Sequence, residues 1–174
     1  SAAAGAIDQV LYSNVFEGLT RFGSDGSVNA GLAESWDISE DGLIYTFYLR
    51  EEARWSNGDK IAAEDFVWSW QRAMLPELAN PYAYSFFVLE NAEAFYKGEL
   101  NEFSWVGVKA LDDLTLQVKL RNPTPYFLQL LAHHTMFPVH RATVEKFGAA
   151  GERGTAWTKP ENIVTSGPFV VSHW

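Results

Sequence analysis

Residues 55–70, WSNGDKIAAEDFVWSW, combine a tight turn with the beginning of a helix. The pair Asn57-Gly58 favours a turn because both residue types tolerate a positive φ angle. From residue 63 to residue 75 apolar side chains recur at helical spacing, and Pro76 ends the predicted helix. The predicted buried stripe of this helix consists of Phe66, Val67, Trp70 and Met74.

Three carboxylates in this stretch raise the question of a chemical site. Glu64 and Asp65 fall in the first turn of the predicted helix, where the positive end of the helix dipole stabilises each carboxylate by roughly 0.3–1 kcal/mol. Ala62 offers no side-chain cap, which costs about 1 kcal/mol, and Asp59 of the turn is the predicted substitute. We therefore interpret residues 55–70 as scaffold.

Two predicted β-hairpins lie on either side of this helix in the chain. In residues 36–50 the turn falls at residues 40–42, and the apolar residues alternate as a strand requires. In residues 105–120 the turn falls at residues 111–113. In the second strand of the first hairpin, the residues predicted to share one face are Leu43, Tyr45, Phe47 and Leu49.

The remaining segments complete a mixture of helices and antiparallel strands. Periodicity predicts helices over 6–19, 83–96, 125–132 and 141–147, the last closed by Gly148. Residues 163–171 are predicted to form a final strand broken at Gly167-Pro168. Together these elements predict an α+β fold, that is, mixed α/β with antiparallel hairpins and helices.

Composition limits the classes of function. The chain has 174 residues, 47% of them apolar, which is enough for the core of one domain or one lobe of a larger protein. A net charge of −9 argues against binding nucleic acid. The absence of cysteine excludes disulfides and thiolate zinc sites, and no apolar run approaches the roughly 18–20 residues of a membrane span.

The two ends of the sequence carry their own signals. The first twelve residues, SAAAGAIDQVLY, lack the basic start and long apolar run of a signal peptide. The last nine, SGPFVVSHW, are strand-like and apolar and have no polar tail, which predicts that the natural chain continues.

No catalytic or metal-binding motif stands out. Asp112 and Asp113 are adjacent in a predicted turn and therefore point in different directions, which does not suit a catalytic carboxylate pair. His133, His134 and His140 lack the helical spacing and acidic third ligand of a common metal site, so we predict no metal. The sequence also lacks a nucleophile elbow, a phosphate-binding loop and a dinucleotide-binding glycine motif.

The segment NPYAYSFF, residues 80–87, places Tyr82 directly after a proline at an element boundary. A tyrosine there offers a flat apolar face and a hydrogen-bonding tip to a ligand. The alternative is a tyrosine of the core, where aromatic side chains usually lie.

Several motifs, in their order along the chain, resemble the oligopeptide-binding proteins of bacterial peptide ABC importers, within family 5 of the extracellular solute-binding proteins. The motifs are LAESWDISEDGLIYTFYLR, ARWSNGDKIAAEDFVWSWQRAM, NPYAYSFF, VGVKALDDLTLQVKL, PTPYFLQLL and WTKPENIVTSGPFVVSHW. The resemblance implies an N-terminal piece of a type II periplasmic-binding-protein fold about three times this length. Residues 17–140 would form the small extra lobe, and residues 1–16 and 141–174 parts of the first large lobe.

The resemblance also implies a function and a site. The full protein would capture oligopeptides outside the cytoplasm, as a periplasmic protein or cell-surface lipoprotein, and deliver them to the inner-membrane permease of an ABC importer. It would have no catalytic residues and no cofactor. Tyr82 would line the peptide cleft, and the peptide backbone would pair with Ala4, Gly5 and Ala6 by strand addition.

Two alternatives stay open from the sequence. Members of the same family also bind nickel, haem, sugars or opines, and the three histidines 133, 134 and 140 would be the ligands in the nickel case. The second alternative is a hydrolase that uses Asp112 or Glu64, which needs two carboxylates facing each other across a cleft.

Overall fold

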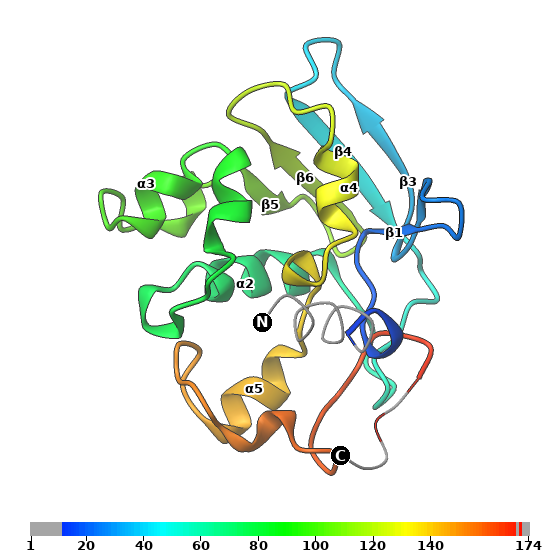
Figure 1. Cartoon of the computed structure of the whole chain (residues 1–174), viewed down its shortest axis with the longest axis vertical. Coiled ribbons are helices and arrows are strands. Elements are labelled where there is room, and N and C mark those ends of the chain that lie inside the picture. The colour runs from blue at the N-terminus through cyan, green and yellow to red at the C-terminus, as the bar shows by residue number, and fades with distance from the viewer. Residues whose placement is uncertain (1–11, 170, 172–174) are drawn as a thin grey trace.

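The computed structural model describes residues 12–169 and 171, and it confirms a mixed fold of helices and antiparallel sheet (Figure 1). Strands β1 (Thr20–Phe22) and β2 (Val28–Ala30) pair around a short turn. A four-stranded sheet follows in the order β3-β4-β6-β5. No helix within the described residues is long and apolar enough to cross a membrane.

The first predicted hairpin is confirmed. Strand β3 (Ala33–Ile38) pairs antiparallel with β4 (Ile44–Leu49), and Gly42 takes a φ of +69° in the turn between them. Glycine reaches this left-handed conformation without the steric cost of a Cβ atom. The predicted alternation also holds, because the buried residues of β4 are Tyr45, Phe47 and Leu49.

The second hairpin is confirmed as well, and it joins the first one in the same sheet. Strand β5 (Val108–Ala110) pairs with β6 (Thr115–Lys119), and β6 also pairs with β4, with Phe47 opposite Leu116. The two central strands, β4 and β6, are therefore far apart in the sequence, and the helical segment between them lies outside the sheet.

Helix α2 (Ala63–Ala73) packs against β5 and β6 and supplies the centre of the core. Phe66, Trp70 and Met74 are fully buried, as predicted, whereas Val67 is only partly buried. The Trp70 indole N–H donates a 2.9 Å hydrogen bond to the Met136 carbonyl, which satisfies its polar atom inside the core.

The prediction that Asp59 replaces the missing cap of α2 is wrong. The Ala62 backbone N–H instead donates to Asp65 Oδ2 at 2.9 Å, and the Trp55 indole N–H reaches the same oxygen at 3.3 Å. Burial raises the pKa of the Asp65 carboxyl, although these hydrogen bonds oppose the shift. Asp59 instead contacts His140, whose Nε2 lies 3.0 Å from Asp59 Oδ2.

The continuous helix predicted over residues 83–96 is also wrong. The segment forms a 3-10 helix η2 (Ala83–Val88) and a short helix α3 (Ala92–Tyr96). Between them Leu89 is extended and forms an isolated bridge with Leu120, and Asn91 takes a φ of +60°. The pairing with the end of the sheet prevails over local helix propensity here.

Shorter helices surround this framework. The 3-10 helices η1 (Pro76–Leu78) and η3 (Phe103–Trp105) flank the region of η2 and α3. After the sheet come α4 (Phe127–Leu131), inside the predicted range 125–132, and η4 (His134–Met136). Figure 1 shows α4 beside the sheet, and the Phe127 ring of α4 lies 5.0 Å from the Tyr45 ring of β4.

Helix α5 (Arg141–Phe147) confirms the prediction over 141–147 and ends at Gly148. It lies at the end of the molecule opposite the sheet, with η5 (Ala156–Thr158) next to it (Figure 1).

The strand predicted over 163–171 is absent from the described part of that segment. The chain there instead crosses two other segments: the Ser56 N–H donates to the Thr165 carbonyl at 2.8 Å, and the Gly167 N–H to the Val15 carbonyl at 2.9 Å. A Cβ atom on Gly167 would lie 2.7 Å from the Val15 carbonyl carbon, so this crossing requires glycine. Of the helix predicted over 6–19, the structure describes residues 12–19: residues 12–15 are helical, whereas residues 16–19 are not, so the predicted extension to residue 19 is wrong.

Candidate functional site

Tyr82, the predicted ligand contact, lies at the beginning of η2 and reaches solvent. Its backbone N–H donates a 3.0 Å hydrogen bond to Asn80 Oδ1. This side-chain-to-backbone turn fixes the direction of the chain at Tyr82. The residue is 37% exposed, so the alternative of a core tyrosine is wrong. The ring of Tyr84, which is even more exposed, lies 6.4 Å from the Tyr82 ring.

Two histidines from a distant part of the chain face Tyr82. The rings of His133 and His134 lie 5.7 and 5.9 Å from the Tyr82 ring, and 4.2 Å from each other. His133 Nδ1 accepts a hydrogen bond from the Thr135 backbone N–H at 3.3 Å, so the hydrogen of a neutral ring is on Nε2. Burial lowers the pKa of His133 and favours this neutral form.

The N-terminal helical residues complete the group. The Tyr12 ring lies 5.3 Å from the His134 ring, so three separate segments meet in one exposed aromatic surface. We call Tyr12, Tyr82, Tyr84, His133 and His134 the aromatic wall. Its ring faces, phenol hydroxyls and imidazoles can stack on a ligand and form hydrogen bonds with it, without a fixed charge.

The other predicted site residues, Ala4, Gly5 and Ala6, lie outside the described residues. Strand addition at this stretch therefore stays a prediction.

The three histidines considered as nickel ligands do not form one group. His140 is buried at the start of α5, where Nδ1 lies 2.7 Å from Thr143 Oγ1 and accepts from the Thr143 backbone N–H at 3.3 Å. Its Nε2 lies 3.0 Å from Asp59 Oδ2. Both nitrogens are thus engaged, and no cluster of three metal-ligating side chains occurs among the residues described.

The carboxylates considered for hydrolysis are surface residues. Asp112 and Asp113 lie on the exposed turn between β5 and β6, where Asp112 Oδ1 accepts a hydrogen bond from the Leu114 N–H. Glu64 is exposed in the first turn of α2. This placement removes the support for the hydrolase alternative.

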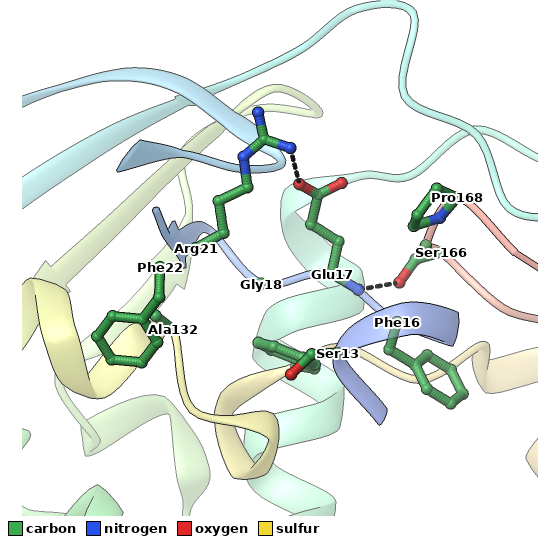
Figure 2. Close-up of a pocket in the computed structure, with 11 residues that line it drawn as sticks. Ser13, Phe16, Glu17, Gly18, Arg21, Phe22, Ala132, Ser166 and Pro168 are labelled. Carbon is green, nitrogen blue, oxygen red and sulfur yellow. Dashed lines mark hydrogen bonds and ion pairs between the residues drawn. The ribbon is translucent and has the colours of Figure 1, made fainter. Parts of the chain in front are cut away.

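A cavity of about 390 Å³ is lined by none of the residues of the aromatic wall (Figure 2). Its lining comes from residues 13–22, from the segment after α4 and from the crossing segment 166–168. Glu17 is its carboxylate: the backbone N–H of Glu17 donates to Ser166 Oγ at 3.0 Å, and the Arg21 guanidinium lies 3.7 Å from the side-chain oxygen.

Sequence reasoning missed the cavity and most of the aromatic wall. The one local signal for Glu17 is an acidic residue inside the run Val15 to Leu19, whose other members are buried. No periodicity indicates that Tyr12 and His134 meet, because their contact depends on the packing of distant segments.

Comparisons with known proteins place these features in a family context. A family model described as bacterial extracellular solute-binding proteins, family 5 Middle, matches residues 27–174. The periplasmic oligopeptide-binding protein OppA of Escherichia coli K12 is 40% identical over 172 residues, which cover 98% of this chain and 30% of the relative.

Two further similarities bear on the ligand and the fold. A probable deoxycholate-binding periplasmic protein, YgiS of the same organism, is 41% identical and covers 92% of this chain and 29% of the relative. The crystal structure of a periplasmic oligopeptide-binding protein from Borrelia burgdorferi matches with a TM-score of 0.90 and 37% identity, over 97% of this chain and 33% of that one. The chain thus spans about a third of the length of these proteins.

Proposed function

This chain belongs to the bacterial extracellular solute-binding proteins of family 5, and on that premise we propose that it is part of a protein that captures oligopeptides for an ABC importer. The proposed location is outside the cytoplasm, in the periplasm or as a lipoprotein at the cell surface. The proposed partner is the inner-membrane permease, with the energy for import supplied by partner ATPases.

The observation that carries this proposal is the aromatic wall, together with the names of the relatives. Exposed ring faces from three segments suit a ligand whose side chains vary, because stacking and van der Waals contact tolerate many shapes. We propose that Tyr82 lines the peptide cleft and that Ala4, Gly5 and Ala6 pair with the peptide backbone.

The proposed protein binds and does not catalyse. Members of the family are solute-binding proteins, and the candidate carboxylates Asp112, Asp113 and Glu64 lie on exposed turns or helix starts. The proposed division into lobes is 17–140 for the small lobe and 1–16 with 141–174 for parts of the first large lobe. The four-stranded sheet lies wholly within the first range, and α5 lies outside it.

The first test is native mass spectrometry of the full-length protein, purified without denaturation. Co-purified masses in the range of short peptides support the proposal. If the full-length protein carries only a metal, haem, sugar or sterol-like mass, it binds another class of ligand. The 174-residue chain alone is expected to bind peptide weakly or not at all, because the rest of the cleft is missing.

The role of Tyr82 is tested by substitution in the full-length protein. Tyr82→Ala is expected to weaken binding of a peptide pool about tenfold in calorimetry, because it removes one aromatic contact. Tyr126→Ala is the matched control, because Tyr126 is an exposed tyrosine that is not part of the aromatic wall. Equal affinities of the two variants would rule out a contact between Tyr82 and the ligand.

A further inference from the structure

A groove of about 410 Å³ lies at the β5 edge of the four-stranded sheet and is lined by none of the residues of the aromatic wall. Its volume lies in the range of small-molecule sites, roughly 300–1,000 Å³. The segment before α3, the helix η3 and the strands β5 and β6 contribute to its lining. We call it the edge groove; Asn91, Trp105, Lys109, Gln117 and Lys119 belong to its lining.

Trp105 is presented to solvent from a fixed backbone. The residue is 65% exposed, although Phe103 and Val106 beside it in the chain are buried. The Asn91 side-chain amide donates a 2.8 Å hydrogen bond to the Trp105 carbonyl, and Asn91 takes a left-handed φ of +60°, which asparagine tolerates better than most residues. A tryptophan held in this way loses little conformational entropy when a ligand binds to it.

Two side chains of the edge groove have no partners of their own. Lys109 and Gln117 lie directly opposite each other on β5 and β6, so their side chains share one face of the sheet. Within the part of the chain that the structure describes, neither side chain forms a hydrogen bond or an ion pair. Lys119 differs, because its Nζ lies 2.6 Å from Glu90 Oε1. The groove therefore carries one uncompensated positive charge, at Lys109.

These features together select a class of ligand. Among the described lining residues Trp105 is the one aromatic residue, and polar or charged residues make up most of the rest. Such a groove suits a ligand with one apolar face, which stacks on the indole, and with polar edges, which form hydrogen bonds. A pyranose ring has this form, because its C–H groups gather on one face and its hydroxyl groups project at the edges. The ammonium group of Lys109 in addition favours a carboxylate.

We propose that the edge groove binds a carboxylated sugar, that is, a pyranose ring that carries a carboxylate at its edge, as a uronic acid does. The apolar face of the ring stacks on Trp105, the Lys109 ammonium donates hydrogen bonds to the carboxylate, and the Gln117 amide pairs with a ring hydroxyl. The site goes beyond the proposed peptide-binding function and does not depend on it, because it uses none of the residues of the aromatic wall.

The test is saturation-transfer NMR of the full-length protein with methyl β-D-glucuronide, which reports both the affinity and the ligand protons that contact the protein. A dissociation constant of about 1 mM is expected for a ligand of this size, with the strongest transfer to the protons of the apolar ring face. Methyl β-D-glucoside has the same ring without the carboxylate. It is expected to bind about tenfold more weakly, because Lys109 then lacks its charged partner.

Variants assign the signal to the edge groove. Trp105→Ala is expected to abolish the transfer, whereas Trp105→Phe retains part of it, because a smaller ring still stacks. Lys109→Gln is expected to weaken binding of the glucuronide about tenfold and to leave binding of the glucoside unchanged. Lys60→Gln, which removes an exposed ammonium group outside the groove, is the matched control and is expected to change neither affinity.

Thermal melts of each variant check the fold, which is expected to persist because Trp105 and Lys109 are exposed. The proposal is overturned if Trp105→Ala binds the glucuronide as tightly as the unmodified protein does. It is also overturned if acetate competes as well as the glucuronide, since charge alone would then explain binding, or if no transfer occurs at roughly tenfold the expected dissociation constant.

Discussion

Single residues of this chain owe their properties to distant neighbours. Tyr82 and Asp65 could be singled out in the sequence, because one follows a proline at a boundary and the other falls in the first turn of a helix. Their partners could not, since His133 reaches Tyr82 only through the fold, and Trp55 reaches Asp65 only through the turn at Gly58. Local signals therefore mark candidate residues, whereas packing decides what each one contacts.

The protonation state of His133 leads to a prediction for stability. Burial holds its folded pKa below the ordinary value, so the unfolded chain takes up a proton at a higher pH than the folded protein does. The stabilising contribution of the neutral ring is present above about pH 6.5 and is lost as the pH falls towards the folded pKa. Denaturant unfolding at pH 7.5 and at pH 5 tests this for the unmodified chain and for His133→Gln. The free energy of unfolding is expected to fall less between these two pH values in the variant than in the unmodified chain. Parallel pH curves for the two proteins would contradict this.

Elements follow the sequence where the local and the tertiary preferences agree. Both hairpins, α2 and α5 form where alternation or helical spacing predicts them. The prediction fails at residues 83–96 and 163–171, where contacts with other segments decide the backbone. At Leu89 a bridge to Leu120 interrupts the helix, and at Thr165 a bond from Ser56 takes the place of strand pairing.

The missing cap of α2 provides a test at the scale of the element. Ala62 has the extended backbone of an N-cap residue, with φ −121° and ψ 163°, but no side-chain oxygen. Ala62→Ser is expected to raise the free energy of unfolding by about 0.5–1.5 kcal/mol, because its hydroxyl can accept an N–H of the first turn. The midpoint of chemical denaturation measures the change. Ala73→Ser, at the last turn of the same helix, has no free N–H group to cap and should give no gain.

The whole molecule is held together by contacts across the proposed boundary between lobes. Asp59 and His140 are 81 positions apart, and their contact joins the turn before α2 to the first residue before α5. The carboxylate of Asp59 is 61% exposed, so water screens the pair and its contribution is modest. The Trp55 ring, 5.3 Å from the His140 ring, covers the same junction.

A double-mutant cycle measures this contact directly. Asp59→Ala, His140→Gln and the combined variant are expected to show a coupling free energy of about 0.5–1 kcal/mol in denaturant unfolding at pH 7. Additive effects of the two substitutions would mean that the junction is held by Trp55 and the backbone bonds alone.

The order of strands in the four-stranded sheet has a consequence for biosynthesis. Strand β4 pairs with β6, whose first residue, Thr115, comes 66 positions after Leu49, the last residue of β4. At roughly 5–20 residues per second, a ribosome needs about 3–13 seconds to make that stretch. During this interval the β3–β4 hairpin has emerged with one edge of β4 unpaired and with Tyr45, Phe47 and Leu49 uncovered. The nascent chain thus passes through a stage at which chaperone binding or a pause in translation would decide between folding and aggregation.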